Sequence, residues 1–165
     1  MAGFTLIEDQ VLGSAAASIT FNTGLTDYTK FRLTVYVVND GSAKIPNVRF
    51  NADSGTNYAY QYLDVTSTSV GSARSTGQTV IPLAVSSTAA NSTSMFTFEV
   101  SKPLATTPAR TTSNSAVMSG GGPVILMDIL AGEWNNTSDL ISSIAVLASA
   151  GNFDTGTRAV LEGAA

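Results

Sequence analysis

The feature that most constrains how this chain can fold is the alternation of apolar and polar residues over short stretches. The alternation is clearest at residues 31–39, where every second position is apolar: Phe31, Leu33, Val35 and Val37. Successive side chains of a β-strand point to opposite faces of a sheet, so this spacing places all four apolar side chains on one face. The sequence therefore predicts a strand at residues 31–39 that buries one face.

Similar short stretches, separated by Gly, Pro and Asn, run along the rest of the chain. Further strands are predicted at residues 4–12, 18–21, 47–52, 58–65, 80–85, 95–100, 124–130, 140–147 and 157–161. Three stretches rich in Ser, Thr and Gly have no periodicity and are predicted to be loops: residues 67–79, 86–94 and 111–122. Residues 137–147 are the best helix candidate, although their sequence suits a strand equally well.

Many short strands without a clear helix favour an all-β fold, a β-sandwich with jelly-roll-like connections. A length of 165 residues suits a single domain. We therefore expect one β-sandwich domain over residues 1–165, in which residues 1–11 form either a docking arm or an edge strand.

The charge composition argues against several classes of partner. Charged residues make up 12% of the chain, and the eight Lys and Arg residues are scattered within a net charge of −4. Nucleic-acid binding needs clustered basic side chains that displace counterions from phosphates. The sequence has neither a basic amphipathic helix nor an apolar stretch long enough to span a bilayer. We therefore expect no nucleic-acid partner and no membrane association. The first ten residues lack a secretory signal, which predicts synthesis in a cytoplasm.

The residue types that most often carry catalysis are scarce. The chain has no His and no Cys, and catalysis at neutral pH usually draws on these residues, on Lys or on tuned carboxylates. Residues 51–55 lack the later Glu that a calcium loop needs, so a turn is favoured there. A hydrolase would need two facing carboxylates, for which the conceivable members are Asp53, Asp64, Glu99, Asp128 and Glu133. We expect no enzymatic activity, no cofactor and no metal site.

The aromatic residues are the best candidates for binding. Tyr58, Tyr60 and Tyr62 fall on one side of the predicted strand at residues 58–65, and Trp134 is the only Trp. Tyr and Trp combine a large apolar face with a polar tip, which suits protein interfaces and stacking on sugars. Packing inside the domain is the favoured interpretation for the tyrosines and for Trp134, and ligand contact is the alternative.

Two strings of residues resemble a known family. "VRFNADSGTNY" at residues 48–58 is similar to a pattern RFN-G-D-(S/T)-G-x-N-Y, with Ala52 where the pattern usually has Gly. Residues 131–163 resemble a closing pattern of Gly-x-Trp, I-x-S-I and G-N-F-x-x-G, although "LEG" at 161–163 departs from its usual Leu-Tyr-Gly ending. Residues 12–21 resemble the first strand. These patterns belong to small β-rich virion proteins and fibre-tip domains of tailed bacteriophages.

The resemblance implies a non-enzymatic β-sandwich that works in a virion, often as an oligomer. We expect a head decoration or cement protein, such as a trimer, that binds the major capsid protein or another virion protein across capsomers. Residues 1–11 are expected to dock, through Phe4, Leu6 and Ile7. The alternative is a tail or fibre module that recognises a host surface glycan through Tyr58, Tyr60, Tyr62 and Trp134.

Overall fold

The computed structural model describes residues 3–39, 44–66, 68–85, 92–102, 104–118 and 125–165. Within these residues the chain forms one short 3-10 helix, Leu25–Asp27, and otherwise strands. The strands are β1 (Thr5–Val11), β2 (Ser18–Phe21), β3 (Lys30–Asn39), β4 (Pro46–Phe50), β5 (Tyr58–Thr66), β6 (Ser69–Gln78), β7 (Ile81–Pro82), β8 (Ser92–Ser101), β9 (Ala109–Met118), β10 (Ile125–Trp134), β11 (Ile144–Ala148) and β12 (Arg158–Ala164).

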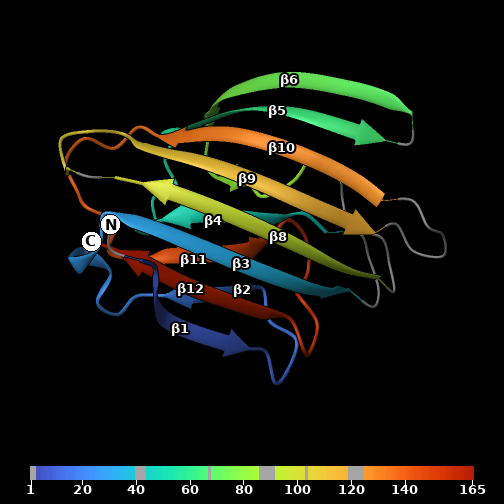
Figure 1. The fold of residues 1–165 in the computed structure, drawn as a ribbon, viewed down its shortest axis with the longest axis horizontal. Helices are drawn as coiled ribbons and strands as arrows, with labels where there is room; N and C mark the ends of the chain where they lie inside the picture. Colours follow the sequence, from blue (N-terminus) through green and yellow to red (C-terminus); the bar gives the residue numbers. More distant parts are fainter. Residues whose placement is uncertain (1–2, 40–43, 67, 86–91, 103, 119–124) are drawn as a thin grey trace.

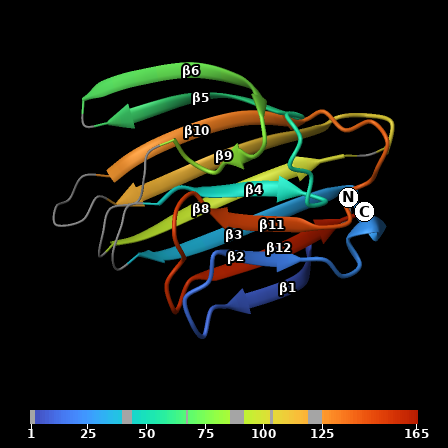
Figure 2. The same ribbon diagram turned by 180° about the vertical axis from the view of Figure 1, so that it is seen from behind.

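The strands form two antiparallel sheets that pack face to face. The larger sheet has the order β1-β12-β3-β8-β9-β10-β5-β6, and the smaller has the order β2-β11-β4-β7. Figure 1 shows the larger sheet in front of the smaller one, and Figure 2 shows the same arrangement from behind. The structure confirms the all-β sandwich, whereas the jelly-roll connections stay a prediction. No helix in the described part of the chain has the length and apolar character needed to cross a membrane.

The predicted alternation of residues 31–39 becomes β3, near the middle of the larger sheet. Leu33, Val35 and Val37 point toward the smaller sheet and are almost fully buried. The core joins both sheets, since Phe50 of β4 lies against Phe98 of β8 with 6.2 Å between their ring centroids. An apolar residue at every second position is therefore sufficient to predict a strand that lies against the smaller sheet.

Two stretches that lack this signal are strands nonetheless, so their prediction as loops is wrong. Ser69–Gln78 forms β6, an edge strand whose one partner among the described strands is β5, and it has no apolar face to bury. Ala109–Met118 forms β9, whose inward positions include polar side chains. One of them, Ser113, is buried and its hydroxyl donates a hydrogen bond of 2.7 Å to the carbonyl of Leu83. The end of the second predicted loop is also wrong, since residues 92–94 belong to β8. Residues 67, 86–91 and 119–124 of the predicted loops lie outside the described residues.

The N-terminal segment contributes a strand to the larger sheet. Thr5–Val11 is β1, which pairs with β12 at one edge and has an irregularity between Leu6 and Glu8. Of the two options for residues 1–11, the described part therefore takes the edge-strand form. Docking through this segment stays a prediction.

Candidate functional site

The two strings that carry the family resemblance meet at Asp53, in the turn between β4 and β5. One carboxylate oxygen of Asp53, Oδ2, accepts hydrogen bonds from Trp134 Nε1 at 2.7 Å and from Asn57 Nδ2 at 3.0 Å. The other oxygen accepts a bond from the backbone N–H of Gly55 at 2.9 Å. Partial burial raises the pKa of Asp53, but these hydrogen bonds outweigh it and hold the pKa below its ordinary value. We call these four residues the Asp53 cluster.

Asn51 joins the same turn to the segment that precedes β11. Its side-chain oxygen accepts hydrogen bonds from the backbone N–H groups of Ser142 and Ser143, at 2.8 and 3.1 Å. Its side-chain nitrogen donates to the carbonyl of Leu140 at 2.8 Å. Both the oxygen and the nitrogen of this amide therefore hold two distant chain segments together. The quoted strings thus have a structural role in this molecule.

Tyr58 and Trp134 belong to the core and are not surface residues. Their exposed fractions are 1% and 0%, and both rings lie against Phe50, with centroids 6.4 and 5.4 Å away. The Tyr58 hydroxyl donates to the carbonyl of Phe50 and accepts from its N–H, and burial raises the pKa of this hydroxyl. Contact of these two side chains with a partner or a sugar is therefore excluded, and the packing interpretation is the correct one for them.

The turn beneath this aromatic group contains a strained alanine. Asn51 and Ala52 have φ values of 51° and 53°, and the N–H of Asp53 donates to the carbonyl of Phe50 at 2.8 Å. Left-handed backbone costs a residue with a Cβ about 1–2 kcal/mol, whereas Gly adopts it freely. Replacing Ala52 with Gly is expected to raise the free energy of unfolding by about 1 kcal/mol and the Tm by about 2–4 °C. Urea and thermal unfolding measure both quantities.

Ala131 supplies the matched control for this substitution. It lies exposed in extended backbone on β10. At such a position Gly relieves no strain, and its only effect is to increase the conformational entropy that the chain loses on folding. Ala131→Gly is expected to lower the free energy of unfolding by about 0.5–1 kcal/mol. A loss of similar size in Ala52→Gly would show that the turn stores no strain.

The outer face of the larger sheet, which points away from the smaller sheet, carries a row of exposed apolar side chains. Tyr36 of β3 pairs with Met95 of β8. Met127 of β10 pairs with Val65 of β5, which pairs with Val70 of β6. Both Met95 and Met127 are in register with Ala116 of β9, the strand between them. Among its members, Met95 is 43% exposed and Val70 is 71% exposed. No other part of the described chain covers these side chains. A second pair, Ile129 of β10 and Leu63 of β5, lies beside this row. We call the row and this pair the apolar band, which consists of Tyr36, Leu63, Val65, Val70, Met95, Met127 and Ile129.

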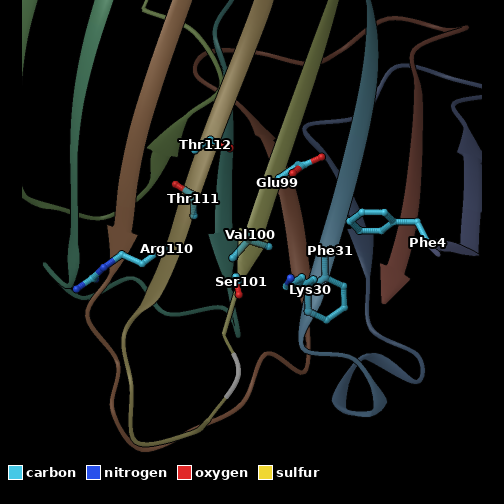
Figure 3. A pocket seen from close by; sticks show the side chains of 9 residues that line it. All are labelled: Phe4, Lys30, Phe31, Glu99, Val100, Ser101, Arg110, Thr111 and Thr112. Atoms are coloured by element: carbon cyan, nitrogen blue, oxygen red, sulfur yellow. The ribbon is translucent and has the colours of Figure 1, made fainter. Parts of the chain in front are cut away.

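The other end of the outer face is polar and hollowed (Figure 3). A depression of about 380 Å³ is lined by Phe4, Lys30, Glu99 and Arg110, among others. The guanidinium of Arg32 lies 4.2 Å from the centroid of the Phe4 ring and forms an ion pair with Glu99 at 2.8 Å. Arg110 also lines a second depression, of about 280 Å³, and pairs with Glu133. Opposite charges are therefore matched across neighbouring strands at this end.

The N-terminal candidates divide between the two faces of β1. Leu6 pairs with Glu162 on the outer face and is 59% exposed, and Phe4 lies over Arg32 on the same face. Ile7 is partly buried and packs against the core. Leu6 is thus accessible to a partner and Phe4 is partly exposed, while Ile7 contributes mainly to the attachment of β1.

Tyr60 and Tyr62 lie together in a third hollow, on the inner side of β5. This groove has a volume of about 280 Å³ between β5, β6 and the segment around β7. The two rings are partly buried, with centroids 6.5 Å apart and planes inclined by 31°. The predicted shared face of the three tyrosines is confirmed, but only Tyr60 and Tyr62 line a groove.

The carboxylates considered for catalysis are mostly engaged elsewhere. Asp53 holds the Asp53 cluster, and Glu99 and Glu133 pair with arginines. Asp64 and Asp128 face each other in register on β5 and β10, and Asp128 accepts a bond from the N–H of Val85 at 3.1 Å. Neither lines any of the three hollows described above. Among the described residues no group of three or more acidic side chains could hold a metal ion.

The comparisons with known proteins add no relative to this chain. Neither a protein-family model, nor a curated protein, nor a solved structure matches it. The likeness to phage virion proteins therefore rests on the quoted strings alone. In the structure these strings account for the contacts of residues 51–53 with Trp134 and with the segment before β11, and not for a binding surface.

Proposed function

We propose that this chain is a structural protein of a tailed-bacteriophage virion, which binds the head shell across capsomers as an oligomeric decoration protein. The observation that carries the proposal is the apolar band. Six of its side chains are 43–71% exposed on one sheet face. Contiguous exposed apolar surface of this kind is typical of protein interaction sites, and its burial against a shell protein would favour binding. Because the chain would bind the assembled shell only, binding would stabilise that shell by mass action.

The charge pattern supports dense display of many copies. Three ion pairs lie on the outer face, Arg32 with Glu99, Arg110 with Glu133, and Arg158 with Asp9. Each pair cancels its own charge, so neighbouring copies would repel one another weakly. The exposed ion pairs add little stability of their own, so their main effect is to leave this face close to neutral.

The free edge at β6 supports the oligomeric part of the proposal. Natural sheets protect their edges with short strands, Pro, bulges or charges. The edge strand β7 has two residues, one of them Pro82, and β1 carries an irregularity and two acidic residues. The pairing of β6 with β5 also has an irregularity, opposite Tyr58 and Tyr60, but β6 runs for ten residues with Arg74 as its only charge. The regular part of a strand of this length can pair with a strand of another copy.

A paired substitution in the apolar band tests the docking. Met127→Glu with Ile129→Glu changes side chains that are 49% and 52% exposed, so the domain should still fold. We expect at least a tenfold loss of binding to purified undecorated shells, measured by co-sedimentation. The control is Leu104→Glu, since Leu104 is 58% exposed outside the strands of the band. Unchanged binding by the folded double variant would contradict docking through this face.

The location in the virion is tested by immunogold electron microscopy of particles from the phage that encodes this chain. Gold spread over heads would support decoration. Gold confined to tails or fibres would instead support the alternative, a receptor-binding module, which the groove beside Tyr60 and Tyr62 favours. Unlabelled particles, with an antibody shown to bind the native protein, would contradict both locations.

A further inference from the structure

The groove beside Tyr60 and Tyr62 differs in chemistry from the other two hollows. Figure 2 shows from behind that β5 and β6 extend past the smaller sheet, and residues of these two strands line the groove. Its lining joins two sheets: Tyr60 and Tyr62 come from β5, Ser75 and Gln78 from β6, and Asn47 from β4. The groove is thus built from strands on three sides.

The lining of this groove is neutral. Among the described residues that line it there is no Asp, Glu, Lys or Arg. The two hollows on the outer face, by contrast, contain Lys30, Glu99, Arg110 and Glu133. Recognition of a phosphate or a carboxylate usually depends on Arg or Lys. The groove therefore suits an uncharged ligand.

Hydrogen-bonding capacity remains unused in this lining. None of the described residues bonds to the hydroxyl groups of Tyr60, Tyr62 or Ser75. The amide nitrogens of Asn47 and Gln78 donate to the carbonyls of Ile45 and Thr76, which fixes the orientation of both amides and leaves their oxygens as acceptors. A purely apolar ligand would bury these polar groups without partners, at a cost in free energy. The ligand should therefore carry hydroxyl groups.

The tyrosine rings supply the apolar part of the site. They occupy successive inward positions of β5, partly buried and inclined by 31° to one another. Such aromatic faces pack against the C–H face of a sugar ring while the phenol oxygens remain available for hydrogen bonds. The volume of about 280 Å³ is slightly below the usual range for ligand sites, which suits a single sugar unit of a longer chain.

From this combination we propose that the groove binds a neutral saccharide, held by stacking on Tyr60 and Tyr62 and by hydrogen bonds to Ser75, Asn47 and Gln78. The site lies on the inner side of β5, away from the apolar band. Binding of a saccharide and docking on a shell are therefore separable properties, and neither depends on the other.

The first test is to apply the fluorescently labelled wild-type chain to an array of neutral and anionic glycans. Binding to one or more neutral glycans is expected, and the affinity should change little between low and moderate salt. Tyr60→Ala and Tyr62→Ala are each expected to weaken binding about tenfold or more. Tyr36→Ala, which removes an exposed tyrosine of the apolar band, is the matched control and should bind as the wild type does.

Milder variants keep the test decisive if an alanine variant fails to fold. Tyr60→Phe and Tyr62→Phe keep the rings and remove only the hydroxyl groups, so a loss of a few-fold is expected. NMR chemical-shift mapping with the best array glycan should place its largest changes on β5 and β6. Three results would overturn the proposal: no neutral glycan bound, binding of anionic glycans only, or shift changes confined to the outer face.

Discussion

Replacing Trp134 with Ala is expected to lower the free energy of unfolding by about 3–5 kcal/mol, the usual loss for a large buried aromatic side chain. Trp134 is fully buried between Phe50 and Tyr58 and donates to Asp53. The substitution therefore leaves a cavity among aromatic rings and removes a hydrogen bond to a carboxylate. Urea unfolding followed by far-ultraviolet circular dichroism measures the loss, because the only Trp is removed and its fluorescence cannot serve.

Trp134→Phe distinguishes the contribution of aromatic packing to stability from that of the hydrogen bond to Asp53. The variant keeps most of the packing and removes the N–H that Asp53 accepts, so a smaller loss of about 1–3 kcal/mol is expected. If the variant is as stable as the wild type at all pH values, the bond to Asp53 contributes nothing.

The hydrogen bond to Asp53 also predicts how the free energies of unfolding of Trp134→Phe and the wild type change with pH. The pKa of Asp53 is lowered in the folded state, so its contribution is present above the ordinary value of 3.8 and is lost as the pH falls through the folded-state pKa. Without the Trp134 bond the folded-state pKa should move back up. Trp134→Phe should therefore lose less stability than the wild type between neutral pH and about pH 3.

Replacing Lys102 with Met is expected to lower the free energy of unfolding by about 1.5–3 kcal/mol, the range for hydrogen bonds to a charged group. Lys102 is 1% exposed, and its ammonium donates to the carbonyls of Thr107 at 2.5 Å, Asn136 at 2.6 Å and Ala105 at 3.3 Å. Burial lowers the pKa of this ammonium. Met keeps the length of the side chain but leaves those carbonyls without their donor.

The matched control for Lys102 is Lys30→Met. Lys30 lies exposed at the start of β3, and its loss should change the free energy of unfolding by no more than about 0.5 kcal/mol. Guanidinium chloride unfolding of both variants, compared with the wild type, checks the difference. Equal free energies of unfolding for the two variants would mean that water donates hydrogen bonds to the carbonyls around Lys102 when the ammonium is absent.

The sequence was a good guide to the strands that lie under the smaller sheet. Residues 31–39 and 95–100 alternate because one face is buried and the other is not, and β3 and β8 follow this pattern. The same reasoning missed β6 and β9. An edge strand has little to bury, and β9 fills inward positions with Thr111 and Ser113, so neither shows the apolar period on which the prediction depends.

The candidate sites were less accessible to sequence reasoning. Tyr58, Tyr60 and Tyr62 share a face as predicted, but only the fold reveals that Tyr58 is bonded to Phe50 while its neighbours line a groove. Asp53 and Trp134 meet across 81 positions of sequence, a separation that no local pattern reports. The sequence did not reveal the apolar band, because residues 124–130 are apolar at every position except Asp128, and such a run is also typical of a fully buried strand.

The position of β12 has a consequence for how the chain folds as it is synthesised. β12 lies between β1 and β3 and pairs with both along its length. A ribosome releases β1 and β3 long before residues 158–164. Until β12 is synthesised, β3 keeps one side unpaired, and β1, whose neighbour among the described strands is β12, has no strand to pair with. Pairing between segments so far apart in the chain is slow. During this interval the nascent chain exposes unpaired strand edges, which makes it prone to aggregation.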